Sequence, residues 1–228
     1  MPTTSWLVLV YRVPSEPASK RVAIWRDLKR LGALYLQQCV CLVPRTEELT
    51  AAVDRVHGKI VDDGGDALCM EIPQLRPADE TKIIDAFRAL RDKEYDELIE
   101  ECETTFVKEI EFERFRQNYT FEEAEEIEQD LEKIRRWCLR IVERDWFAAP
   151  RRSAAEAWID KCQLLLDAFE HDVYERDSRA HASQDTHAAS LDRSSHSHSD
   201  GGQESAPPRH SAQGRRAAPR QEDENHDH

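Results

Sequence analysis

A short apolar run near the start of the chain constrains the fold more than any other feature. Residues 6–14 read Trp-Leu-Val-Leu-Val-Tyr-Arg-Val-Pro and are rich in β-branched and aromatic side chains. A run of this length and composition that ends at a proline is typical of a buried β-strand rather than a helix. We therefore expect it to be the central strand of a small sheet around which residues 15–76 fold.

The segments that follow alternate between helical and extended patterns. Apolar residues between positions 19 and 31 recur at i, i+3 spacing, which predicts a helix that Ser19 caps and Gly32 ends; they are Val22, Trp25, Leu28 and Leu31. Two short strands over 34–37 and 39–43, a second helix opened by Thr46 and a strand over 67–72 complete the region. The order β-α-β-β-α-β predicts a ferredoxin-like module over residues 1–76, with both helices on one face of a four-stranded antiparallel sheet.

From residue 79 onward the apolar residues recur only at helical spacing. A long helix is expected to reach about Gln117, and capping boxes at Thr120 and Ser153 open two more helices. Amphipathic helices with short connections predict an antiparallel three-helix bundle over residues 79–176, so the fold class is α+β. Residues 178–228 are mostly polar and low in complexity, and we expect this tail to be disordered because it cannot bury enough apolar surface.

The formal net charge of -14 is unevenly distributed along the chain. Residues 1–78 carry 10 Lys/Arg and 9 Asp/Glu, whereas residues 79–132 carry 7 Lys/Arg and 20 Asp/Glu. An anion-binding surface is therefore expected on residues 1–78 or on residues 133–177, where cations and acids balance, and not on the acidic middle of the chain. Six cysteines without a Cys-x-x-Cys pair, no signal-like leader and no long apolar run predict a soluble, cytoplasmic protein with free thiols and no membrane contact.

The first predicted helix carries cations on the side opposite its apolar stripe. Together with a cation at the end of the first strand, the candidate DNA- or anion-binding set is Arg12, Lys20, Arg21, Arg26, Lys29 and Arg30. The alternative is an ordinary solvated helix face, on which long side chains cover apolar surface. A second basic cluster over residues 133–144 has acidic residues between its cations, which favours ion pairing there.

Cys39 and Cys41 are the candidate redox residues. They lie two residues apart on a predicted strand, so both side chains would point to one face, with Cα atoms roughly 6.5–7 Å apart. That separation is too long for an easy disulfide, and the two residues are either redox-sensitive thiols or small core residues.

The sequence offers no pattern for a catalytic site, a metal or another cofactor. The glutamates of the long helix lack the Glu-x-x-His pairs of di-metal centres, and histidines gathered in the tail are either weak metal ligands or compositional drift. No catalytic triad, phosphate-binding loop or zinc pattern occurs. We therefore expect a non-enzymatic protein.

Several stretches together resemble the N-terminal domain of the chromate-resistance regulator family of the ChrB type. They are residues 6–14, 23–26, 31–37, 118–122, 130–137 and 144–147, and the resemblance covers residues 5–175. It implies a transcriptional regulator of a chromate stress response, with DNA and chromate or another oxyanion as partners. Family members usually carry a further C-terminal domain, which we expect to be absent here, with the low-complexity tail in its place.

We therefore predict a non-enzymatic regulator that binds DNA phosphates or an oxyanion through the basic helix face and forms a homodimer through the sheet edge or the bundle. One alternative is a protein-interaction scaffold that acts through the helical bundle. Another is a thiol-based sensor of chromate or redox state that uses Cys39 and Cys41.

Overall fold

The apolar run at the start of the chain forms β1 (Trp6–Arg12), which lies in the interior of the sheet as its composition predicts. The structure, a computed structural model, describes residues 4–195, with side chains described through residue 183. The sheet order is β2-β3-β1-β4, and its other strands are β2 (Leu34–Gln37), β3 (Val40–Pro44) and β4 (Asp66–Ile72). Every neighbouring pair is antiparallel.

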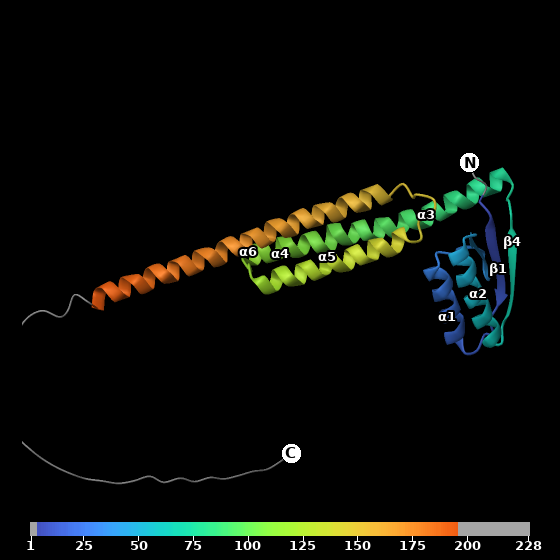
Figure 1. Cartoon of the computed structure of the whole chain (residues 1–228), viewed down its shortest axis with the longest axis horizontal. Coiled ribbons are helices and arrows are strands. Elements are labelled where there is room, and N and C mark those ends of the chain that lie inside the picture. The colour runs from blue at the N-terminus through green and yellow to red at the C-terminus, as the bar shows by residue number, and fades with distance from the viewer. Residues whose placement is uncertain (1–3, 196–228) are drawn as a thin grey trace, which may run out of the picture. The chain divides into compact units, whose positions relative to one another are not determined.

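Two helices, α1 (Ala18–Arg30) and α2 (Glu47–Asp62), cover one face of this sheet (Figure 1). Because side chains alternate along a strand, Leu7 and Leu9 of β1 point to this face, where they join a buried cluster with Ile24, Leu28 and Val53. The element order and the strand order are those of the split βαβ arrangement, and the predicted order β-α-β-β-α-β is confirmed.

The predicted apolar stripe of α1 is right at Leu28 and wrong at Val22 and Trp25. Ile24 and Leu28, four residues apart, are fully buried against the sheet, whereas Val22 and Trp25 are 41% and 47% exposed. Successive residues of a helix point about 100° apart, so burying Ile24 turns Trp25 toward the edge of the interface. The predicted Ser19 cap is also not observed, because the helix begins at Ala18 after Pro17 without a side-chain cap.

The second half of the described chain is helical. α3 (Pro77–Glu101) continues through a π-helical turn, η1 (Cys102–Phe106), into α4 (Val107–Arg116), and α5 (Phe121–Val142) and α6 (Arg152–Ser195) complete the set. The three helical rods lie side by side (Figure 1) around a continuous buried core. Thr120 accepts a hydrogen bond from the Glu123 backbone N–H at 3.2 Å, so this part of the predicted cap is confirmed.

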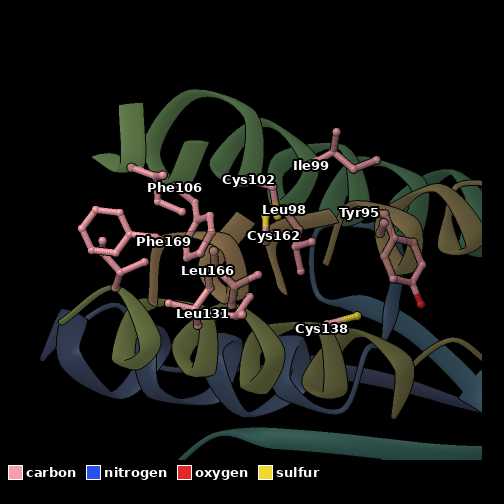
Figure 2. Packing of buried hydrophobic residues seen from close by; sticks show 14 of the residues in the cluster. Tyr95, Leu98, Ile99, Cys102, Phe106, Leu131, Cys138, Cys162, Leu166 and Phe169 are labelled. Atoms are coloured by element: carbon pink, nitrogen blue, oxygen red, sulfur yellow. The ribbon is translucent and has the colours of Figure 1, made fainter. Parts of the chain in front are cut away.

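The bundle core contains buried cysteines as well as aliphatic and aromatic residues (Figure 2). Cys102, the first residue of η1, and Cys162 of α6 are both fully buried in this core. A hydrogen bond with Cys162, together with burial, raises the pKa of the Cys102 thiol. These cysteines therefore belong to the interior of the bundle and not to a surface site.

A second apolar cluster, on the face of the sheet opposite α1 and α2, joins the sheet to the helices. Trp6 of β1 stacks on Phe87 of α3 and on Phe147 after α5, with ring centroids 5.9 and 5.8 Å apart. At the C-terminal end of α1, Gly32 has φ +70, and a Cβ there would meet the side chains of Arg144 and Trp146. The close approach therefore favours glycine on steric as well as conformational grounds.

The expected tail differs from the structure at its beginning. α6 continues to Ser195, well past the predicted boundary at residue 178. Alanines at 180 and 182 favour helix, and an Arg179–Glu175 ion pair at i, i+4 supports this turn. The rest of the predicted tail, with most of its histidines, lies outside the described residues.

The chain divides into a unit of residues 1–180 and a remainder from residue 181, and the contacts described here belong to the first unit. The finer boundaries at 76 and 176 stay predictions. None of the helices between residues 4 and 195 is long and apolar enough to cross a membrane.

Candidate anion-binding site

A hollow of about 470 Å³ opens where β1 ends, between the first turns of α1 and the β2–β3 turn. β1 contributes Tyr11 and Arg12, α1 contributes Arg21 and Trp25, and the strand-turn segment contributes Tyr35, Gln38 and Cys39. Most of the wall is aromatic or aliphatic, and its cations are the two arginines. Sites for small molecules commonly combine such an apolar wall with a few polar groups.

The backbone holds the parts of this hollow together. The Tyr11 N–H donates to the Cys39 carbonyl at 2.9 Å, which ties the end of β1 to the β2–β3 turn. Cys39 has φ 65, a left-handed conformation that allows the tight turn. The prediction that Cys39 and Cys41 share one strand is therefore wrong, because β3 begins at Val40.

The two tyrosines form part of the wall without adding negative charge. Their hydroxyl oxygens lie 3.1 Å apart and share a hydrogen bond. A tyrosine phenol is already protonated at neutral pH, and burial raises the pKa of both Tyr11 and Tyr35 further from it. No acidic residue lines the hollow within the described part of the chain. The electrostatic potential in the hollow therefore reflects its arginines.

The structure divides the six predicted cations into three groups. Arg12, Arg21 and Arg26 are exposed, and none of them forms an ion pair with a described residue. Lys20 is paired with Asp63 at 3.2 Å, and Arg30 with Asp27 at 3.3 Å.

Lys29, the remaining member of the set, lies over the Trp25 ring, with its Nζ 5.3 Å from the ring centroid. The cations best placed to meet an external anion are therefore the three arginines. Their role in binding stays a prediction.

The second basic cluster, on α5, lies among carboxylates. Lys133 pairs with Asp130 at 2.6 Å and Arg135 with Glu132 at 2.9 Å, as the sequence pattern predicts. Arg136 and Arg140 form no ion pair among the described residues, but each borders a surface hollow that also contains acidic side chains. This cluster is therefore less suited to an external anion than the one around α1.

The two candidate thiols have different surroundings. Cys39 is half-buried and borders the hollow, whereas Cys41 is only 2% exposed and packs in the core beneath α1 and α2. Burial raises the pKa of Cys41 to about 12. Because the thiolate is the reactive form of cysteine, Cys41 is poorly suited to a redox reaction at neutral pH. The proposed thiol sensor stays a prediction that relies chiefly on Cys39.

Sequence patterns missed several residues of the hollow. The sequence pattern places Trp25 in the buried stripe of its helix, and no local signal indicates the roles of Tyr35 and Gln38. The four-residue spacing of Arg21 and Trp25 places both on one side of α1. In the sequence, this spacing is the signal that an aromatic ring lies beside a cation of the helix.

A separate surface feature lies where α4 meets α5. Phe115 is 85% exposed, and Phe112, Phe121 and Tyr174 are also exposed. Phe121 and Tyr174 pack edge to face, with ring centroids 6.4 Å apart. Exposed aromatic groups of this kind are common at protein interfaces.

Metal ligands do not gather anywhere in the described residues. No group of three or more His, Cys, Asp or Glu side chains there is arranged to hold a metal ion. The acidic side chains of the bundle are instead solvated or paired, for example in the Arg144–Glu94 ion pair at 3.0 Å.

The fold and the hollow together define an α+β protein that joins a split βαβ module to a helical bundle and presents open arginines beside an apolar pocket. The model of the family described as "Protein ChrB, N-terminal" matches residues 21–180, which is more than half of the chain. The chain therefore belongs to this family, and the resemblance inferred from its sequence is confirmed.

A relative within this family is Protein ChrB of Cupriavidus metallidurans. It is 29% identical over 92 residues, which cover 40% of this chain and 27% of that protein. The chain thus spans only about a quarter of the relative that it matches. No solved structure matches the chain.

Proposed function

We propose that this chain is a non-enzymatic regulatory protein of chromate resistance that binds DNA phosphates or an oxyanion through Arg12, Arg21 and Arg26. Membership of the ChrB family supports the regulatory role. The observation that carries the binding proposal is that all three guanidinium groups are exposed and have no acidic partner in the described chain.

Two physical arguments favour these arginines over the other cations as binding groups for an external anion. A guanidinium group presents donors in a planar fork that fits two oxygens of a phosphate. A cation that already has a carboxylate partner must give up that interaction before it binds another anion. The three open arginines do not have this cost, whereas Lys20 and Arg30 do.

The acidic middle of the chain limits how DNA can approach. Residues 79–132 carry 20 Asp/Glu against 7 Lys/Arg. At physiological salt, screening reduces such repulsion beyond about 8 Å. Binding is therefore expected to be strongly salt-dependent and limited to the surface around α1.

The test is a fluorescence-anisotropy titration of the full chain against duplex DNA from upstream of its own gene, at several salt concentrations. Arg21→Glu/Arg26→Glu should abolish binding at moderate salt. Each lost phosphate contact should also flatten the slope of log K against log[salt] by about 0.9. The matched control is Arg136→Glu/Arg140→Glu, which reverses the same number of charges on α5.

The control double variant should retain wild-type affinity and slope. Equal losses in the two double variants would show a general effect of net charge and would contradict the proposal. Absence of wild-type binding to DNA at low salt, and to chromate or sulfate by calorimetry, would also contradict it.

A second candidate function is a protein-interaction scaffold, which the exposed aromatic residues where α4 meets α5 favour. In that case a protein partner should remain bound to Arg21→Glu/Arg26→Glu and be lost from Phe112→Ser/Phe115→Ser. Sedimentation of the purified chain would test the predicted homodimer separately.

A further inference from the structure

The hollow at the end of β1 is larger and more apolar than an inorganic oxyanion requires. Its volume is about 470 Å³, within the usual range of small-molecule sites. An inorganic tetraoxyanion occupies the space of only a few water molecules, each about 30 Å³. Such an ion could contact the arginines but would leave the aromatic wall in water.

The wall has apolar surface that a ligand can cover. Val22 and Trp25 border the hollow and are 41% and 47% exposed. Burying apolar area is favourable by about 25 cal/mol per Å², so a flat apolar body against these side chains would add to the affinity. The Lys29 ammonium over the Trp25 ring brings a further positive charge close to this surface.

The polar groups indicate which charge that body should carry. Arg12 and Arg21 border the same hollow from different elements, and neither has an acidic partner among the described residues. The hydroxyls of Tyr11 and Tyr35 are bonded to each other. The Gln38 amide adds a neutral polar group at the β2–β3 turn. The lining has no carboxylate that could pair with a cationic ligand, and its two arginines would repel one.

We propose that the hollow binds a small organic anion with a flat apolar body, whose acidic group contacts Arg12 and Arg21 and whose body lies against Trp25. The proposal rests on the proposed function in one respect, because it uses arginines of the same basic face. It does not need DNA binding, and it assigns this hollow to an organic ligand rather than to a bare oxyanion.

The experiment uses naphthalene-2-sulfonate as the aromatic anion and follows the ¹⁵N–¹H indole signals of the full chain. The chain has five tryptophans, and Trp25→Phe identifies the relevant signal by its loss. The neutral 2-naphthalenemethanol and inorganic sulfate are titrated in parallel at constant ionic strength. The expected result is saturable binding of naphthalene-2-sulfonate with a Kd of about 1 mM, seen at Trp25.

The second part of the experiment substitutes one of the two arginines that line the hollow. Arg21→Gln should weaken binding of naphthalene-2-sulfonate by about tenfold, because one charge-assisted hydrogen bond is lost. Arg55→Gln is the matched control, because Arg55 is an exposed arginine of α2 that does not border the hollow. This control should bind like the wild type, and thermal unfolding of both variants verifies that they fold.

Three results would each overturn the proposal: no shift at Trp25, equal affinity for the neutral alcohol, or a sulfate response of equal strength. An unchanged affinity in Arg21→Gln would overturn it as well. The DNA titration separates this proposal from the proposed function. If the chain binds DNA but not naphthalene-2-sulfonate, only the organic-ligand proposal is rejected. If it binds naphthalene-2-sulfonate but neither DNA nor an oxyanion, only the proposed regulatory binding is rejected.

Discussion

Two helices of this chain, α1 and α5, each carry a cluster of cations, but their surroundings differ. On α5, Lys133 and Arg135 pair with neighbouring carboxylates, and the hollows beside Arg136 and Arg140 contain further acidic groups. Around α1, the hollow beside Arg12 and Arg21 has no acidic lining residue. The two clusters therefore have similar numbers of positive charges and different capacities to attract an external anion.

The comparison shows why a count of positive charges is a poor guide to function. A surface attracts an anion through the summed potential of all nearby groups, and interleaved carboxylates cancel much of the field of neighbouring arginines. On α5, Lys133 and Arg135 pair with carboxylates of their own helix, and Arg144, just after the helix, pairs with Glu94 of α3. On α1 the open arginines add little to the fold and remain available for binding.

The largest expected effect is on the free energy of unfolding, and it tests whether paired arginines stabilise the fold more than open ones do. The Arg144 side chain donates to Glu94 at 3.0 Å and to the Arg140 carbonyl at 2.8 Å, and it is only 17% exposed. Arg144→Met should lower the free energy of unfolding by about 1.5–3 kcal/mol, because Glu94 loses one of its two largely buried partners and keeps Arg91 at 3.2 Å. Urea denaturation monitored by circular dichroism measures this change.

The matched substitution on α1 is Arg26→Met. Because Arg26 is exposed and unpaired among the described residues, its loss should change the free energy of unfolding by no more than about 0.5 kcal/mol. Similar destabilisation by the two substitutions would contradict the separation between structural and available cations.

A smaller effect on stability, measured in alkaline solution, tests whether Cys41 belongs to the core while Cys39 belongs to the open site. Burial raises the pKa of Cys41 to about 12 from a usual value of 9.0. Between these two values the unfolded chain has lost the thiol proton while the folded chain keeps it, so stability falls as the pH rises. The contribution of Cys41 to this fall should be about 1.4 kcal/mol per pH unit or less.

Cys41→Ala removes this contribution. Unfolding free energies measured between pH 8 and 10.5 should therefore decline less steeply in Cys41→Ala than in the wild type. Other buried thiols and phenols titrate in the same range, so the difference between the two proteins is the relevant quantity. Identical slopes would indicate that Cys41 ionises freely in the folded chain and would restore it as a candidate redox thiol.

Much of the fold could be predicted because it depends on local patterns. The apolar run of β1, the Thr46 cap of α2 and the Thr120 cap of α5 are each set by neighbouring residues, and the structure has all three. The π-helical turn η1 could not be predicted in this way. It lies within a continuous helical pattern and begins at Cys102, whose partner Cys162 is distant in sequence.

The candidate site was predictable only in part. The cations of α1 are visible in the sequence, but which of them stay unpaired depends on residues from other elements, such as Asp63 for Lys20. Arg12, Trp25 and Tyr35 line the hollow together although they come from two strands and a helix. A periodic pattern describes one element at a time and cannot predict that these three residues lie close together. Tertiary contacts therefore decided which of the predicted residues could act together.

The most direct test of the difference between α1 and α5 is phenylglyoxal labelling of arginines, read by mass spectrometry with and without the duplex DNA. We predict that DNA protects Arg12, Arg21 and Arg26 from modification and leaves Arg136 and Arg140 as reactive as before. Protection of the α5 arginines with continued labelling of those around α1 would contradict the central claim.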